Sequence, residues 1–391
     1  IIQCIEKVES ELTVQTTTEK ELRESGLLVT IGEEIDQAYN DQLQTLVLDQ
    51  ELLLKNAADL HIVFTPLHGT SNKSIRRGLA SMGFSNVTIV KEQELPDPNF
   101  STVKSPNPEE HEAFELAIRY GLQEDADILL GTDPDADRLG IAVKNDKGEY
   151  IVLTGNQTGA LMLEYLLMKK QENGTLPENG MIIKTIVTSE IGRHIGKAYG
   201  IPTIDTLTGF KYIGEKINEF EQNGKHTFLF GYEESYGYLI GDFVRDVATY
   251  YQSKGQTLYE GLLDIYQKHG WFQEDLVSMT LKGRDGAAQI QQMMENFRNH
   301  PPKVIGGKMV ESVEDYLVNE CTSLIIGMKS EIGLPQSNVL KYTFSDGSWF
   351  TLRPSGTEPK MKAYISAKGN SKEEAQKFVE ALKNDVGALG L

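Results

Sequence analysis

Short apolar runs alternate with stretches in which apolar residues recur at helical spacing, from about Ala57 onward. This pattern predicts strands at 62–64, 87–90, 127–130 and 139–144 and helices at 73–82 and 111–120. A strand, a helix and a second strand in that order form a βαβ unit. The Asn-Asp-Lys-Gly turn at 145–148 predicts a hairpin after the last of these strands.

A second unit repeats this plan and a third departs from it. The second is predicted to have strands at 181–187, 201–205 and 227–230 and helices at 190–199, N-capped by Ser189, and 212–222. From about Glu274 the order of elements changes, with strands at 276–281, 339–344 and 349–352 and helices at 287–298 and 372–386. We therefore predict an α/β fold of two α/β domains, 41–150 and 151–272, followed by a smaller α+β domain, 273–391.

The first 40 residues do not fit either pattern. They are polar and acidic, with helical spacing over Glu19–Gly26, and we interpret them as a linker or the tail of a preceding domain. The sequence starts with Ile1 and not with Met, so we expect that an N-terminal part is missing.

Composition narrows the classes of function. The 391 residues carry a formal charge of −19, and 39% of them are apolar, which is typical of a globular chain. We expect no nucleic acid and no membrane partner, because both need a basic face or a long apolar run. Cys4 and Cys321 lie far apart, which fits a reducing compartment such as the cytoplasm. The oligomeric state does not follow from the sequence.

The first chemical motif is the loop G-T-D-P-D-A-D-R-L-G at 131–140. Asp133, Asp135 and Asp137 stand at alternate positions directly after a predicted strand, and three such close carboxylates repel one another unless a cation compensates. Hard cations such as Mg²⁺ take oxygen ligands. A calcium EF-hand is excluded because Arg138 stands where that loop needs Gly. A solvated acidic turn is the alternative, but we predict a metal site.

The second motif is R-P-S-G-T-E-P-K at 353–360. Arg353 can bind a phosphate through two hydrogen bonds, and Ser355 and Thr357 offer hydroxyls. Gly356 allows close backbone approach, so that neighbouring N–H groups can surround an anion. A tight turn with incidental polar residues is the alternative to this predicted phosphate site.

Two further loops are weaker signals on their own. Glu233, Glu234 and Ser235 follow a predicted strand and can hydrogen-bond the hydroxyls of a sugar, although an ordinary acidic loop looks the same. The loop at 206–211 offers Thr208, Gly209 and Lys211 as an anion contact. His68 follows a strand in a loop containing glycine, and a structural role for it is at least as plausible as a catalytic one.

In their order and spacing, these four loops resemble those of the α-D-phosphohexomutase family of phosphoglucomutases and phosphomannomutases. The resemblance covers nearly the whole chain, and the D-P-D-A-D-R and Y-E-E-S-Y-G-Y versions are most similar to a subgroup that includes phosphoglucomutases of bacilli. It implies three-layer α/β domains and a phosphoserine in a first domain. That serine exchanges a phosphoryl group with a sugar monophosphate, through glucose 1,6-bisphosphate in the case of glucose, and so interconverts hexose 1-phosphate and hexose 6-phosphate.

The resemblance also implies a role for each matched residue. Asp133, Asp135 and Asp137 would hold Mg²⁺, with Arg138 beside them as a possible catalytic group. The other matched residues would bind the sugar phosphate, namely Thr208, Gly209, Lys211, Glu233, Ser235, Arg353, Ser355, Gly356 and Thr357. Which sugar is preferred stays open between glucose, mannose and pentose phosphates.

Two departures from the family pattern matter. The family's T-A-S-H-N-P phosphoserine loop is absent, so we expect this chain to be domains two to four without the phosphoryl carrier, and to be inactive by itself. After Arg245-Asp246 the subgroup usually continues with Lys-Asp and a long helix, whereas Val247 follows here. The family's candidate for proton transfer therefore has no counterpart to assign.

Two alternative functions remain at this stage. A haloacid-dehalogenase-like phosphatase also places D-x-D after a strand, but its usual D-x-D-G-T is absent and it leaves the loop at 353–360 unexplained. A non-catalytic sugar-phosphate binder is the second alternative, since a chain without its phosphoserine can still bind.

Overall fold

The structure is a computed structural model that describes residues 2–8, 10–239, 243–281, 286–355 and 359–388. Residues 1–45 and 46–391 are two separate compact units. The first unit contains the short elements α1 (Ile2–Ile5), η1 (Glu11–Thr13), α2 (Glu19–Glu24) and α3 (Glu33–Gln44). Helix α2 confirms the predicted helix at 19–26, and Thr18 and Glu21 form a capping box at its start.

The first sheet of the second unit has the strand order β2-β1-β3-β4-β5. Its strands are β1 (Ile62–Thr65), β2 (Val87–Ile89), β3 (Ile128–Thr132), β4 (Leu139–Lys144) and β5 (Tyr150–Val152). The accompanying helices are α4 (Gln50–Asn56), α5 (Ser71–Ser81), η2 (Lys91–Gln93), η3 (His111–Phe114) and α6 (Glu115–Glu124). Strand β1 pairs in parallel with β2 and β3, and β4 pairs antiparallel with β3 and β5, which confirms the predicted βαβ unit and hairpin.

The second sheet has the order β7-β6-β8-β9. Its strands are β6 (Gly180–Thr185), β7 (Thr203–Thr206), β8 (Thr227–Tyr232) and β9 (Tyr238–Leu239). The helices of this region are α7 (Gly155–Glu172), α8 (Ile191–Ala198), α9 (Phe210–Asn223), α10 (Phe243–Ser253) and α11 (Leu258–His269). Because β6 pairs in parallel with β7 and β8, the loops that follow these strands meet at one edge of the sheet.

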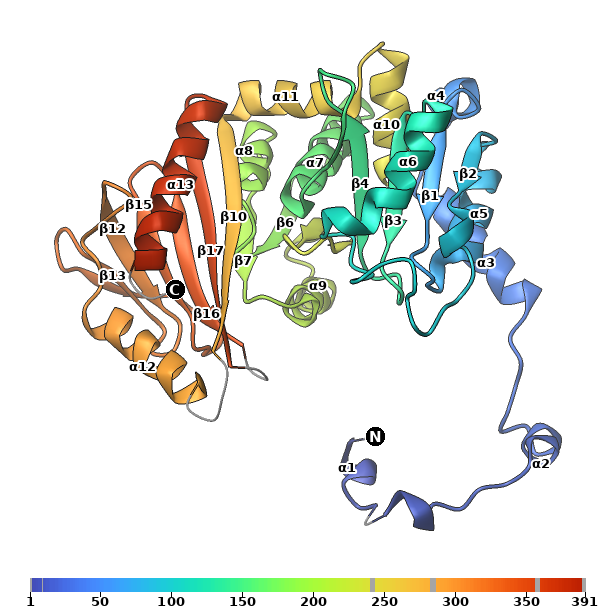
Figure 1. The fold of residues 1–391 in the computed structure, drawn as a ribbon, viewed down its shortest axis with the longest axis horizontal. Coiled ribbons are helices and arrows are strands. Elements are labelled where there is room, and N and C mark those ends of the chain that lie inside the picture. The colour runs from blue at the N-terminus through green and yellow to red at the C-terminus, as the bar shows by residue number, and fades with distance from the viewer. Residues whose placement is uncertain (1, 9, 240–242, 282–285, 356–358, 389–391) are drawn as a thin grey trace. The chain divides into compact units, whose positions relative to one another are not determined.

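The C-terminal sheet has the order β10-β17-β16-β15-β12-β13-β14, and β11 pairs with β12. The strands are β10 (Trp271–Thr280), β11 (Val304–Ile305), β12 (Lys308–Asp315), β13 (Glu320–Ser323), β14 (Lys329–Glu331), β15 (Leu340–Phe344), β16 (Trp349–Pro354) and β17 (Lys360–Gly369). Helices α12 (Gly286–Asn299) and α13 (Lys372–Ala388) share one apolar core with this sheet (Figure 1). The predicted fold class is confirmed: two α/β regions are followed by an α+β region whose sheet is antiparallel.

Several predicted boundaries were wrong, and helices α3, α4, α7, α10 and α11 were not predicted. Strand β6 ends at Thr185, not at 187, and α8 begins at Ile191 with Glu190, not Ser189, as its N-cap. Strand β10 begins at Trp271, five residues before the predicted start at 276. Helix α7 has buried residues on every side over most of its length, so it lacks the polar stripe from which helices are recognised. No helix among the described residues is both long enough and apolar enough to cross a membrane.

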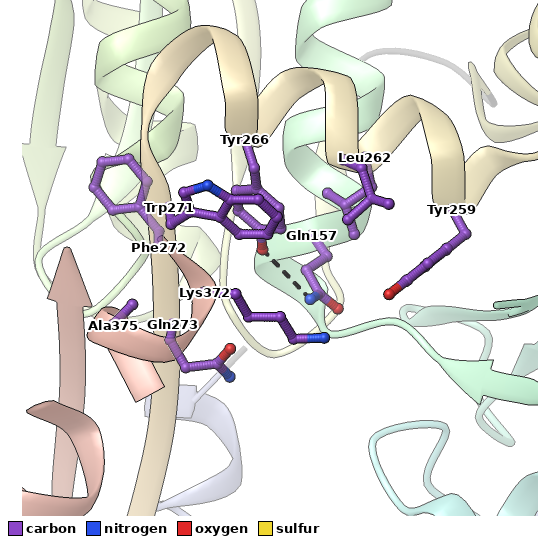
Figure 2. A pocket seen from close by; sticks show the side chains of 10 residues that line it. Gln157, Tyr259, Leu262, Tyr266, Trp271, Phe272, Gln273, Lys372 and Ala375 are labelled. Carbon is purple, nitrogen blue, oxygen red and sulfur yellow. Dashed lines mark hydrogen bonds between the residues drawn. The ribbon is translucent and has the colours of Figure 1, made fainter. Parts of the chain in front are cut away.

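The second and third sheets are joined where α11 ends and β10 begins. Gly270 stands at this joint with φ +102°, a conformation that favours glycine. The rings of Tyr266 and Trp271 stack across the joint with centroids 5.1 Å apart. Figure 2 shows the small pocket beside them, where the Gln157 side-chain amide donates to the Tyr266 hydroxyl at 3.4 Å and Lys372 reaches in from the start of α13. None of the predicted site residues lines this pocket.

Two glycines at the fifth position of their helices test how tightly α7 packs. A Cβ on Gly159 would lie 2.4 Å from the buried Tyr232 ring, whereas a Cβ on Gly214 of α9 would meet nothing within 4 Å. We expect Gly159→Ala to lower the free energy of unfolding by about 1–3 kcal/mol through overpacking. The control Gly214→Ala should raise it by about 0.5–1 kcal/mol through helix propensity. Urea denaturation measures both, and changes of equal sign would contradict this account of α7.

Candidate functional site

The predicted metal loop connects two buried, paired strands, β3 and β4. Carboxylate oxygens of Asp133, Asp135 and Asp137 all lie within 4.8 Å of one another. Asp133 is buried directly after β3, whereas Asp135 and Asp137 are exposed. Ala136 turns the chain between them with φ +65°, and its N–H donates to the Asp133 carbonyl at 3.1 Å. The structure therefore brings the three predicted ligands together.

The electrostatics of this cluster favour a bound cation. Burial, followed by the nearby carboxyl groups of Asp137 and Asp135, raises the pKa of Asp133 to about 7. The backbone N–H of Arg138 donates to Asp133 at 3.0 Å and opposes this rise only in part. Three oxygen donors of like charge, one of them destabilised as an anion, fit a hard divalent cation.

A second loop, residues 66–70 between β1 and α5, packs against the metal loop. The N–H of Thr70 donates to the Pro134 carbonyl at 2.9 Å, and the hydroxyls of Ser71 and Thr132 lie 2.6 Å apart. A Cβ on Gly69 would lie 2.5 Å from Pro134 Cα, so only glycine fits there without a shift. This close contact fixes the backbone between the first two aspartates.

His68 lies in the same supporting loop and is buried. Its Nδ1 lies 2.8 Å from the Leu95 carbonyl and its Nε2 lies 2.8 Å from the Thr102 hydroxyl. With both ring nitrogens in hydrogen bonds, His68 is placed to hold the loop, which favours the structural alternative left open by the sequence.

Arg138 forms an ion pair with Glu109, a residue that the sequence analysis did not select. Its Nη1 lies 2.7 Å from the Glu109 carboxylate, while its Nε lies 3.7 Å from Asp133 and 3.8 Å from Asp137. Glu109 lies between the predicted strand at 87–90 and the predicted helix at 111–120, in a stretch that contains four prolines and has no predicted element. The acidic pair after Pro108 was the one signal in the sequence, and nothing in its local pattern linked it to the metal loop.

The predicted sugar loop, residues 233–237, lies between β8 and β9, and its two glutamates make different contacts. Glu233 accepts a hydrogen bond from the Gly209 N–H at 2.6 Å. Glu234 instead accepts from the hydroxyls of Thr185 at 3.2 Å and Thr188 at 3.3 Å. Burial, then the charge of Glu233, raises the pKa of Glu234 to about 7. Glu234 is thus an internal support, and Ser235 lies half-buried beside it.

The sugar loop is also tied to the metal loop and to the loop at 206–211. The Leu139 N–H donates to the Tyr236 carbonyl at 3.1 Å. Gly209 has φ +123°, which favours glycine and lets its N–H reach Glu233. The Lys211 ammonium is exposed and lies 4.7 Å from the Tyr212 ring centroid. The buried Thr208 hydroxyl has no hydrogen-bond partner within the described part of the chain.

The predicted phosphate loop follows β16 in the C-terminal sheet. Arg353 is half-buried at the end of this strand, opposite Lys362 of β17, and Ser355 N–H donates to the Lys360 carbonyl at 2.7 Å. Several positive side chains therefore gather at this end of the sheet. The other two predicted residues, Gly356 and Thr357, lie outside the described residues.

The pKa of Glu233 in the sugar loop depends on charged residues of the metal loop and of the phosphate loop. Burial raises the pKa of Glu233, while the positive charges of both Arg138 and Arg353 lower it. Arg138 belongs to the metal loop and Arg353 to the phosphate loop, so both guanidinium groups act on one carboxylate of the sugar loop. The sequence predicted this convergence only through the family resemblance, because the three residues are far apart in the chain.

Comparison with known proteins identifies the origin of this arrangement. Residues 37–148, 154–260 and 289–384 match the models for domain II, domain III and the C-terminal domain of phosphoglucomutase/phosphomannomutase. A phosphoglucomutase of Staphylococcus aureus is 39% identical over 337 residues, which cover 83% of this chain and 60% of that protein. The chain thus spans about 60% of the length of this curated relative.

Solved structures give the same fold. A phosphoglucomutase of Paramecium, the exocytosis-sensitive phosphoprotein parafusin, aligns with a TM-score of 0.63 and 18% identity over 90% of this chain and 61% of its own. A phosphoglucomutase/phosphomannomutase family protein of Burkholderia thailandensis aligns with a TM-score of 0.57 and 14% identity over 90% of this chain and 64% of its own. The alternative functions gain no support from these matches. The chain belongs to the α-D-phosphohexomutase family.

Proposed function

We propose that residues 46–391 bind a sugar phosphate for a phosphoglucomutase-type transfer between hexose 1-phosphate and hexose 6-phosphate. The observation that carries this proposal is that three carboxylates gather within 4.8 Å in the metal loop, while hydrogen bonds tie that loop to the sugar loop through Leu139 and Tyr236 and the sugar loop to Gly209 through Glu233. A ligand with phosphates at both ends, such as glucose 1,6-bisphosphate, would contact the metal loop with one and the Arg353 loop with the other. Phosphoryl transfer depends mainly on such positioning and on charge neutralisation.

At the first end, Asp133, Asp135 and Asp137 would hold Mg²⁺. The bound ion would neutralise charge on the phosphoryl group. Arg138 stands beside this cluster, and its ion pair with Glu109 keeps the guanidinium close to Asp133 and Asp137. We assign to Arg138 the orientation of the phosphate nearest the metal.

In the middle and at the second end, the chain offers donors and acceptors for sugar hydroxyls and for the phosphate that is not transferred. We assign sugar hydroxyls to Glu233 and Ser235, since Glu234 is occupied by two threonines. The remaining contacts to the anion are assigned to Thr208, Gly209, Lys211, Arg353, Ser355, Gly356 and Thr357. Specificity for glucose over mannose or pentose phosphates would be set by the hydroxyl contacts in the middle.

The domain organisation and the compartment are part of this proposal. We assign 41–150 to the domain with the metal loop, 151–272 to the domain with the sugar loop, and 273–391 to the phosphate-binding domain. We assign the protein to the cytoplasm, on the basis of two free cysteines, Cys4 and Cys321, that lie far apart in the sequence.

The metal site makes a prediction about pH. Because the pKa of Asp133 is raised to about 7, a proton competes with Mg²⁺ below that pH, and calorimetry should show affinity falling as pH decreases from 8 to 6. Without metal, the folded state holds this proton more tightly than the unfolded chain, so stability should rise as pH falls through 7.

The metal site also predicts the effect of a substitution. Asp135→Asn should weaken Mg²⁺ binding at least about tenfold, whereas Asp146→Asn in the exposed turn should not. Equal Mg²⁺ affinity in both variants would refute the site.

The phosphate loop makes a second prediction. Arg353→Ala should weaken glucose 1,6-bisphosphate binding by roughly 10- to 100-fold, the loss expected for a charged hydrogen-bonding partner. Arg119→Ala is the matched control, because Arg119 is exposed on α6 and pairs only loosely with Glu92 at 3.7 Å. Mg²⁺ binding should be unchanged in both variants. The assignment of Arg353 fails if the two variants bind the bisphosphate equally well.

A third prediction concerns turnover. The 391 residues contain no T-A-S-H-N-P loop, so the chain by itself should bind a sugar phosphate without isomerising it. A coupled assay with glucose 1-phosphate, Mg²⁺ and glucose 1,6-bisphosphate measures this directly. Any turnover above the blank that Asp135→Asn abolishes would show that the chain carries its own phosphoryl acceptor.

A further inference from the structure

The turn between β6 and α8, residues 186–190, is held by a lysine buried beneath it. Lys184 has no exposed surface, and its ammonium donates to the carbonyls of Thr185 at 3.2 Å and Thr188 at 3.1 Å. The same ammonium lies 2.9 Å from Glu190 and 3.1 Å from Asp205. Buried carbonyls need donors, and Lys184 supplies them from inside the second sheet.

A second lysine reaches the same turn from the C-terminal sheet. Lys341 of β15 is buried, and its ammonium donates to the Ile186 carbonyl at 3.0 Å. It lies 3.8 Å from Glu190 and 4.8 Å from the Trp349 ring centroid. Ile186 and Trp349, the two residues beside this ammonium, belong to one apolar cluster of buried residues, namely Ile186, Val187, Leu207, Tyr316, Val339, Trp349 and Tyr364. The contact is therefore buried, and it joins the second and third sheets far along the chain from the joint at Gly270.

Charge balance in the network does not account for Lys341. Arg193 already pairs with Glu190 at 2.8 Å and with Asp205 at 2.7 Å, so Lys184 and Arg193 match the two carboxylates. Burial and the positive charge of Lys184 lower the pKa of Lys341 by more than nearby carboxylates raise it. Burying the Lys341 ammonium in surroundings that disfavour its charge costs free energy. The interaction that Lys341 gains in return is its hydrogen bond to the Ile186 carbonyl of the turn.

The turn at 186–190 also fixes the position of the sugar loop. The hydroxyls of Thr185 and Thr188 lie 2.7 Å apart, and both donate to the partly buried Glu234 carboxyl. Glu234 directly follows Glu233, the carboxylate on which Arg138 and Arg353 both act. Lys341 is therefore linked to the loop that is assigned to the sugar by its hydrogen bond to Ile186, by the backbone of the turn, and by the two threonine hydroxyls that donate to Glu234.

We propose that Lys341 and Lys184 are positioning residues, which set the C-terminal sheet and its Arg353 loop in register with the sugar loop through the turn at 186–190. This proposal rests on the proposed function, because the register matters for a ligand that touches both loops. A ligand that contacts two elements gains affinity from their preset spacing, and a ligand that contacts one of them does not.

The test is Lys341→Met in the full chain, with Lys329→Met as the control, since Lys329 is exposed on β14. Calorimetry should show glucose 1,6-bisphosphate binding weakened at least about tenfold in Lys341→Met. Inorganic phosphate and Mg²⁺ should bind within about twofold of the unmodified chain, because each contacts one loop. General damage to the fold would weaken all three, and unchanged bisphosphate affinity overturns the proposal.

Amide hydrogen exchange makes the test independent of the proposed function. In Lys341→Met, exchange should accelerate at 185–190 and at 231–235 but not at 131–138. If the unmodified chain binds no bisphosphate, the proposed function fails, and these rates still decide: acceleration in both segments supports the coupling, and its absence at 231–235 overturns it. Thr188→Val, which removes one hydroxyl from Glu234, should give the same selective loss of bisphosphate affinity if Lys341→Met does not fold.

Discussion

The repulsion among the three carboxylates at Asp133, Asp135 and Asp137 is the constraint on which the rest of the site depends. The chain holds them close by placing the first directly after a buried strand and by fixing Pro134 against Thr70 and Gly69. This arrangement costs stability in the absence of a cation, as the raised pKa of Asp133 indicates. Strain of this kind is common where a site is built for a ligand that compensates it.

The remaining loops are arranged around that cluster by backbone contacts and buried charges. Tyr236 ties the sugar loop to the end of the metal loop, and the turn after β6 ties it to the C-terminal sheet. In the role proposed for them, the buried Lys184 and Lys341 orient the groups that would contact the substrate and do not contact it themselves.

Predictions from the sequence were reliable where a regular pattern of apolar residues ends at turn residues or at a group of residues with a distinct chemistry. The β1 to β3 unit and the β4–β5 hairpin were predicted because their apolar runs end at turn residues, and the three aspartates stood out because alternate acids rarely follow a buried strand. Helix α7 was missed because burial on every side removes the amphipathic pattern. Glu109, Lys184 and Lys341 were missed because a lone charged residue gives no local sign that it will be paired far along the chain.

The central claim is that one ligand joins the acidic cluster and the Arg353 loop. A crystal structure of this chain with Mg²⁺ and glucose 1,6-bisphosphate tests it most directly. The account predicts electron density for one phosphate beside the metal held by Asp133, Asp135 and Asp137, and for the other within hydrogen-bond distance of Arg353. Well-defined density for the bisphosphate elsewhere, with both loops unliganded, would contradict it.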